Sequence, residues 1–255
     1  MTPNVNKGKR SPWLFWAMAI ALVLLVVGGM AVYLNRQHIF HPRVNIDRQQ
    51  YPVAGIDVSA HNGYVDFKKV KAAGYSFVFV KASEGARYRD SLFRRHVADA
   101  HASGLVVGAY HFFRKSRDGR AQALNFLAAV EGVSLDMPLV VDVEDWGNDN
   151  NVDSVTARRR LKDLVDRLQV SGRSVMIYTN GDGYEDYYKK GRYESLPLWI
   201  CAFKQPDKLQ APAVFQQYSH WGEVDGLDGD VDLNIFIGSN DDWKRWLSQC
   251  LSRNR

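Results

Sequence analysis

The longest apolar stretch of the chain lies near its beginning. No charged residue occurs between Arg10 and Arg36, and residues 13–32 are almost wholly apolar. About 20 helical residues span the roughly 30 Å apolar core of a bilayer. A buried core helix would need a polar face, and this stretch has none. The pattern predicts a transmembrane helix over residues 13–34.

Residues that flank this helix predict its orientation. Lys7, Lys9 and Arg10 precede it, so the positive-inside rule keeps residues 1–12 in the cytoplasm as a short basic tail. The aromatic residues suited to a membrane interface stand near its two ends: Trp13, Trp16 and Tyr33. A cleaved signal peptide is the alternative, but its apolar core is about 7–15 residues long and ends in a small-x-small site. The longer run, with no good A-x-A after it, favours an uncleaved anchor.

A polar, basic linker at residues 35–50 precedes a domain over residues 51–255. In this domain, short apolar runs alternate with helical patterns. Each run fits a strand buried on both faces, as in parallel sheets. The runs lie at residues 53–58, 77–80, 106–112, 139–143, 175–178, 198–202, 214–218 and 231–236.

Helical patterns follow most of the early strands. Asp66 can cap a helix that closes at Gly74, and a second helix begins at Phe93 and ends at Gly104. A third covers residues 120–130, and Ser154 can cap a fourth.

The last three strands are separated by short segments rich in Pro, Gly and Asp, and residues 243–251 can form a closing amphipathic helix. The order predicts an α/β fold, an irregular TIM-like barrel of five βα units followed by three strands. A doubly wound open sheet is the alternative, but its GxGxxG phosphate loop is missing from the sequence.

Composition narrows the possible functions. The chain has a formal net charge of +5, which suits an anionic polymer such as a cell wall, a membrane surface or nucleic acid, or simply solubility. No block of like charges resembles a nucleic-acid-binding arm. The spacing of Cys201 and Cys250 fits no metal motif, and the histidines form no HxH or HExxH pattern. We therefore expect no metal site and no cofactor. Each cysteine lies in a mostly apolar stretch, so two buried free thiols are expected, and a disulfide between them in an exported domain is the alternative.

Carboxylates recur at the predicted strand ends, where barrels carry their functional residues. Asp57 lies in the first strand and Asp232 in the last, while Asp142 and Glu144 are two residues apart in the fourth and point to one face. Acids that share a pocket raise the pKa of at least one member. The result is a proton donor beside anionic groups, which glycosidic bond cleavage requires.

Simpler interpretations of these acids stay open. Asp57 could cap a turn, Asp232 could pair with a lysine, and the D-x-E triplet could lie on a solvated face. Carboxylates also suit Mg²⁺ or Ca²⁺.

Further polar and aromatic residues near the strand ends are candidates for substrate contact. Tyr110 and Tyr178 could stack on a sugar or pack in the core. Lys81 and Glu84 could contact substrate or pair with each other. Four weaker candidates are His61, Asn62, Trp199 and Gln217. His111 points to the opposite strand face from Tyr110, so we expect a buried structural histidine there.

Eight segments, in order across nearly all of residues 51–240, resemble the glycoside hydrolase family 25 lysozymes of the Chalaropsis type. They are GIDVSAHNG at 55–63, KASEGARYRD at 81–90, GLVVGAYHFF at 104–113, PLVVDVED at 138–145, IYTN at 177–180, LWICAF at 198–203, FQQY at 215–218 and GDVDLN at 229–234. Each segment alone is weak, but eight in register are specific.

The resemblance implies N-acetylmuramidase activity on the β-1,4 bonds of peptidoglycan, with Glu144 as proton donor. It implies that Asp142 positions and polarises the N-acetyl group of the substrate, with Asp57 and Asp232 as further members of the acidic cluster. It favours the acetamido oxygen of the substrate as nucleophile over a covalent aspartyl sugar. It also agrees with a barrel of five βα units and three further strands.

The combined expectation is an enzyme held at the inner membrane by one helix, with its domain outside the cytoplasm and peptidoglycan glycan strands as its partner. The sequence carries no signal for an oligomeric state. A peptidoglycan-binding module without catalysis and a hydrolase of another amino-sugar polymer, such as chitin, are the alternatives. Export makes a nucleic-acid partner improbable.

Overall fold

The computed structural model describes residues 12–36, 44–148 and 151–253, which fall into two units on either side of Arg43 and Val44. In the first unit, helix α1 (Pro12–Arg36) contains an apolar stretch, Phe15–Tyr33, that is long enough to cross a membrane by length and composition. Lys7, Lys9 and Arg10 lie outside the described residues, as do residues 37–43 of the predicted linker.

The second unit contains a closed sheet. Its eight barrel strands are β1 (Ala54–Val58), β2 (Phe77–Glu84), β4 (Val106–Phe112), β5 (Leu139–Asp142), β6 (Val175–Asn180), β7 (Leu198–Cys201), β8 (Phe215–Gly222) and β9 (Val231–Phe236). The sheet closes because β1 pairs with β2 on one side and with β9 on the other. Strand β9 is antiparallel to both of its neighbours, and the other barrel strands are parallel. The predicted closed α/β barrel is confirmed. A short strand that the sequence analysis did not predict, β3 (Tyr88–Arg89), pairs with the end of β2.

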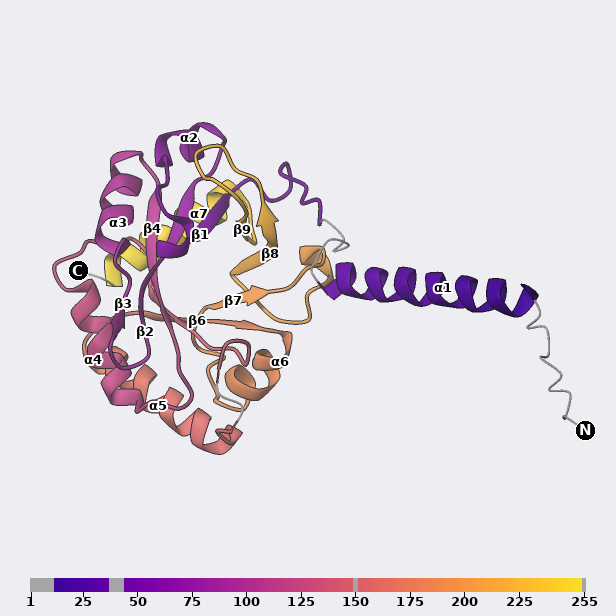
Figure 1. Cartoon of the computed structure of the whole chain (residues 1–255). Helices are drawn as coiled ribbons and strands as arrows, with labels where there is room; N and C mark the ends of the chain where they lie inside the picture. Colours follow the sequence, from indigo (N-terminus) through magenta and orange to yellow (C-terminus); the bar gives the residue numbers. More distant parts are fainter. Residues whose placement is uncertain (1–11, 37–43, 149–150, 254–255) are drawn as a thin grey trace, which may run out of the picture. The chain divides into compact units, whose positions relative to one another are not determined.

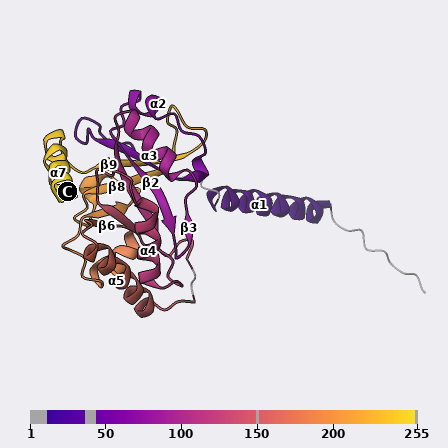
Figure 2. The same ribbon diagram turned by 90° about the vertical axis from the view of Figure 1, so that its left-hand side faces the viewer.

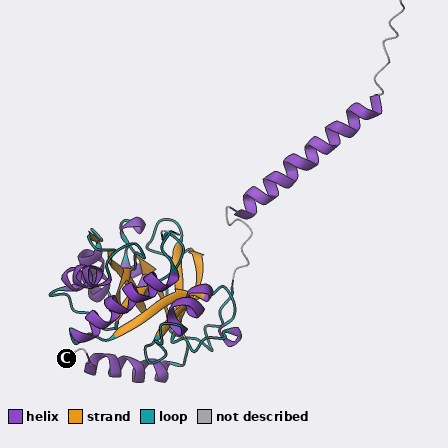
Figure 3. Cartoon of the chain, turned by 90° about the horizontal axis from the view of Figure 1, so that it is seen from below, coloured by secondary structure: helices purple, strands orange, loops and turns teal. Residues whose placement is uncertain are grey.

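Helices surround this sheet (Figure 1). They are α2 (Phe67–Ala72), α3 (Phe93–Ala102), α4 (Gly119–Val130) and α5 (Ser154–Val170), with short turns η1 (Ala60–Asn62), α6 (Gly181–Gly183), η2 (Tyr184–Lys189) and η3 (Pro206–Lys208). Seen from below, the helices lie outside the strands (Figure 3). Asp66 caps α2 as expected. The expected cap of α5 was wrong by one residue, because the Asp153 carboxylate accepts the Thr156 amide and Ser154 is already helical.

The barrel interior is apolar at one end. Phe77 and Phe79 on β2 pack there with Trp199 and Phe215. Gly108 makes room for these large rings, because a Cβ atom there would lie 2.5 Å from the Phe79 ring.

Helix α7 (Asn240–Arg253) covers the apolar end of the barrel (Figure 2). Trp243 and Trp246 of this helix pack on Phe215 and Phe236, which lie where the parallel strands begin. Because α7 covers this end, the interior residues at the carboxyl ends of the parallel strands form the other end of the barrel, where the polar side chains gather.

Candidate active site

Four carboxylates lie together at the carboxyl ends of the parallel strands. Asp57 lies in β1 and is the register partner of Asp232 in β9. Asp142 is the last residue of β5, and Glu144 follows it by two positions. The Asp57 and Asp142 side chains are buried, while Glu144 and Asp232 are partly exposed. The barrel therefore brings together all four acids that the sequence singled out.

Asp57 is held by a chain of hydrogen bonds inside the barrel. Its Oδ2 accepts from Gln217 Nε2 at 2.9 Å and from Asn234 Nδ2 at 2.8 Å. Trp199 Nε1 donates to Asn234 Oδ1 at 2.9 Å, and the Tyr178 hydroxyl donates to Gln217 Oε1 at 2.7 Å. Since each amide donates to the acid and accepts from an aromatic side chain, the carboxyl group of Asp57 is fixed in place.

The acids resist ionisation to different degrees. Burial, followed by the charge of Asp232, raises the pKa of Asp57 well above its usual range. Burial, followed by the charge of Glu144, does the same to the pKa of Asp142. Burial also raises the pKa of Glu144 to about 7, although the positive charge of His220 acts in the opposite direction. A carboxyl group that changes its protonation state near neutral pH can serve as a general acid and base.

A cavity of about 190 Å³ opens beside Asp57 and Asp232. His61, Asn62 and Tyr110, which the sequence suggested as substrate contacts, also line it. Asn62 is fixed there because its Oδ1 accepts the Ser59 amide at 2.9 Å. Most of the residues that line the cavity are polar.

The loop that carries Glu144 is tied down on both sides. Asn148 Nδ2 donates to the carbonyl oxygens of Glu144 and Phe113, each at 2.9 Å, and its Oδ1 accepts the Lys115 amide at 2.8 Å. The Lys115 ammonium group is buried and donates to Asp145 Oδ1 at 2.8 Å. These bonds fix the backbone on which Glu144 is mounted.

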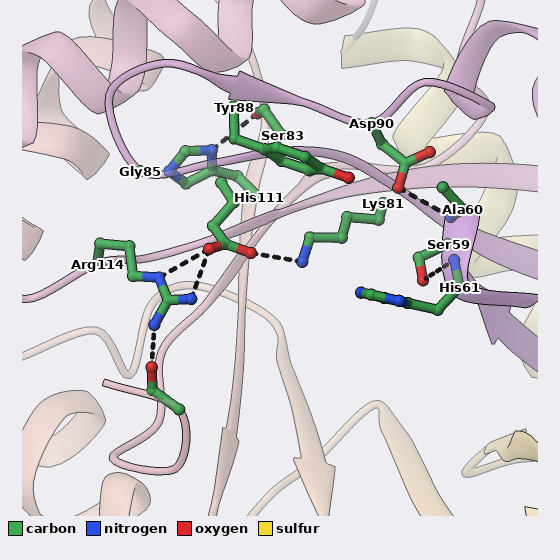
Figure 4. A network of polar contacts seen from close by, with 12 residues as sticks. Ser59, Ala60, His61, Lys81, Ser83, Gly85, Tyr88, Asp90, His111 and Arg114 are labelled. Carbon is green, nitrogen blue, oxygen red and sulfur yellow. Dashed lines mark hydrogen bonds and ion pairs between the residues drawn. The ribbon is translucent and has the colours of Figure 1, made fainter. Parts of the chain in front are cut away.

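A second network joins Lys81 and Arg114, both labelled in Figure 4, through the carboxylate of Glu84. Lys81 Nζ donates to its Oε2 at 2.7 Å, and Arg114 Nε donates to its Oε1 at 2.8 Å. Although burial raises it, hydrogen bonds from Lys81 and Arg114 lower the pKa of Glu84 overall. Arg114 also donates to the Gly147 carbonyl, which connects this network to the loop of Glu144. Lys81 and Glu84 therefore pair with each other, and the charge of Lys81 also acts to lower the pKa of Asp142.

Some polar residues near the acids were not found from the sequence. His220 Nδ1 lies 2.7 Å from Asp232 Oδ1. Asn234, which bonds to Asp57, could have been found because it is two positions from Asp232 in the same strand. Asn148 lies in a loop, where no helical or strand periodicity of the sequence indicates which way a side chain points. His111 is fully buried as expected, with Nδ1 2.8 Å from the Ser83 hydroxyl (Figure 4).

Neither the cysteines nor the histidines and acids form a metal site in the part of the chain that the structure describes. Cys201 is half-buried in β7 with its sulfur 3.8 Å from His220 Nε2, and Cys250 is buried in α7. Among the residues that the structure describes, no group of three His, Cys, Asp or Glu side chains is arranged to hold a metal ion.

The chain is similar to known proteins over most of its length. The model of the family described as "Glycosyl hydrolases family 25" matches residues 56–227. The chain is 34% identical over 184 residues to "Autolytic lysozyme" of Clostridium acetobutylicum, which covers 71% of this chain and 55% of that protein. It is 34% identical over 205 residues to "Lysozyme M1" of Streptomyces globisporus, which covers 73% of this chain and 68% of that protein. A solved family 25 glycosyl hydrolase from Bacillus anthracis superposes with a TM-score of 0.70 at 27% identity, covering 81% of this chain and 98% of that one.

Proposed function

The chain belongs to glycosyl hydrolase family 25, and we propose that it is a muramidase that hydrolyses the β-1,4 bond between N-acetylmuramic acid and N-acetylglucosamine in peptidoglycan. One observation carries this proposal: the half-buried Glu144, whose pKa is about 7, lies among three further acids at the open end of the barrel. Such a carboxyl group holds a proton at neutral pH and loses it at small cost, as glycosidic bond cleavage requires.

In the first step, Glu144 gives its proton to the glycosidic oxygen as the bond from that oxygen to C1 of N-acetylmuramic acid breaks. The acetamido oxygen of the same sugar bonds to C1 and takes up the developing positive charge. The ionised Glu144 then removes a proton from a water molecule, whose oxygen attacks C1 and releases the acetamido group. Glu144 ends the cycle protonated, so one residue serves as acid and then as base.

Asp142 is proposed to orient the acetamido group and polarise it toward C1. Its Oδ1 is buried with no hydrogen-bond partner in the protein, an arrangement that costs free energy. A hydrogen bond with the substrate amide would relieve this cost and would hold the acetamido oxygen in line for attack.

Asp57 and Asp232 are proposed to complete the negative potential around the positively charged transition state. Tyr110, His61 and Asn62 line the adjacent cavity and are proposed to contact the sugar. The remaining candidates are proposed to support these groups from within the barrel: Tyr178, Gln217 and Trp199 through Asp57, and Lys81 and Glu84 through their ion pair.

Product analysis tests the reaction. The full-length chain in detergent is incubated with purified peptidoglycan, and the soluble products are identified by mass spectrometry. Muropeptides with reducing N-acetylmuramic acid ends are expected. Binding to the wall without release of products would instead support a binding module. Cleavage of chitin but not of peptidoglycan would support a hydrolase of another amino-sugar polymer.

The pH dependence follows from the raised pKa of Glu144. Only the protonated acid can start the reaction, so kcat/KM should fall as pH rises through about 7, by about tenfold per pH unit beyond it. A glutamate with its ordinary pKa of 4.5 would produce this fall near pH 4.5. Initial rates on soluble glycan fragments between about pH 4 and 9 measure the curve. A basic limb near pH 4.5 would contradict the assignment.

The apolar helix α1 is proposed to anchor the enzyme in the inner membrane, with the barrel outside the cytoplasm. We expect the chain to stay with the membrane pellet after carbonate extraction. Replacing Leu24 and Val26 with lysine should release it, because a charge at the centre of a span costs about 2.5–3.5 kcal/mol per residue. A shortened chain in the soluble fraction would indicate a cleaved signal peptide.

A further inference from the structure

Strand β8 contains an irregularity beside the acids. Gln217 is the register partner of Asn234 and Ser219 that of Leu233, so β8 uses one more residue than β9 at this point. Such a bulge re-aims the side chains that follow it and is common next to active sites. The next residue, His220, is therefore brought opposite Asp232, and the two side chains meet at 2.7 Å.

The imidazole of His220 contacts neighbours of several kinds, and 39% of its side chain is exposed. The Phe203 and Trp221 rings meet it edge-on, with centroids at 4.8 and 5.7 Å. Cys201 Sγ lies 3.8 Å from Nε2. Contacts on several sides hold the ring in one orientation, in which Nδ1 faces the Asp232 carboxylate.

The charges around this ring are mostly negative. Although burial lowers it, the hydrogen bond and charge of Asp232 raise the pKa of His220 overall, with smaller contributions from Asp57 and Glu144. The ionisable groups that interact with His220 or Glu144 from the surrounding strands and loop are Asp57, Asp142, Asp145, Tyr178, Cys201 and Asp232. Each group in this set is negative when ionised, whereas the positive charge of His220 opposes the raised pKa of Glu144.

We propose that His220 is a positioning residue of this site, which orients the Asp232 carboxylate and supplies the positive charge that faces Glu144. This inference rests on the proposed function. In the cycle above, Glu144 becomes an anion once it has protonated the glycosidic oxygen. The imidazolium stabilises that anion until the water molecule returns a proton, while its bond to Asp232 keeps the cation in place.

The first test is the pH profile of kcat/KM for the His220→Gln variant of the full-length chain. Glutamine keeps a donor for Asp232 but removes the positive charge. The basic limb should move to higher pH by about one unit, because Glu144 then faces Asp232 without a compensating cation. A matched control is His101→Gln, which disrupts a different His–Asp pair. His101 lies on α3, and its Nε2 is 2.9 Å from Asp136 Oδ2. The control should leave the limb in place. An unmoved limb in His220→Gln would overturn the proposal.

The second test does not depend on the folding of that variant. The His220 imidazole is titrated by NMR in the wild-type chain and in Glu144→Gln. Because coupling between two sites is reciprocal, the pKa of His220 should fall when the charge of Glu144 is removed. Identical titrations in the two chains would overturn the proposal. A wild-type chain that fails to cleave peptidoglycan but shows this coupling would refute the muramidase function and leave the charge pairing intact.

Discussion

Replacement of Glu144 by glutamine should reduce kcat/KM on peptidoglycan by about 10²–10⁴-fold, the usual contribution of a general acid. Glutamine has nearly the same shape, and the loop beneath it is fixed through backbone groups by Asn148, so the geometry of the site should survive. What is lost is the proton that the leaving oxygen needs. Release of reducing ends measures the rate, and a pull-down with insoluble peptidoglycan measures binding, which should change little.

A surface glutamate provides the matched control. Glu185 lies on η2 and pairs with Lys189 at 2.9 Å, with more than half of its side chain exposed. Exposed pairs of this kind contribute about 0–1 kcal/mol, so Glu185→Gln should keep full activity. If Glu144→Gln also kept full activity, another residue would have to be the proton donor and the mechanism proposed above would be wrong.

Strand patterning explains why the acidic cluster could be predicted from the sequence. Asp57, Asp142 and Glu144 stand at the ends of apolar runs, and parallel strands in a barrel end on the same side. Asp232 lies in the last apolar run of the domain. The strand formed by this run pairs with the first strand because the sheet closes, so Asp232 comes to lie beside Asp57. The burial of His111 followed from the two-residue period of its strand.

The same period explains what the sequence did not reveal. In regular alternation His220 would point away from the face that Gln217 occupies, and the bulge in β8, which no residue type announces, reverses this. Trp199 was suggested as a substrate contact, but it lies deeper in the barrel. Its ring is nearly fully buried against Phe79, away from the open end. Register irregularities and depth along a strand depend on the neighbouring strand, so one strand's pattern cannot supply them.

Replacement of Asp142 by asparagine should lower activity by about 10²–10³-fold, comparable to the loss of a preorganised group aimed at developing charge. The loss should depend on the acetamido group of the substrate. On glycan strands whose muramic acid has been de-N-acetylated, the wild-type chain should already be slow and Asp142→Asn little slower. Two changes that remove one interaction do not add. Losses that multiply would mean that Asp142 acts independently of the acetamido group.

The same variant should be more stable than the wild type at neutral pH. The pKa of Asp142 is raised in the folded chain, so above the unfolded value of about 3.9 the folded state must either hold a proton or bury a charge. Asparagine avoids this cost, and its Tm should exceed that of the wild type at pH 7. The difference should vanish below about pH 3.9, where both states of the wild type are protonated. Asp166→Asn, at an exposed pair with Lys162, should show neither effect.

If Asp142→Asn were less stable than the wild type at pH 7, Asp142 would support the fold. Higher stability together with lower activity would show that the burial of Asp142 serves the reaction at the expense of the fold.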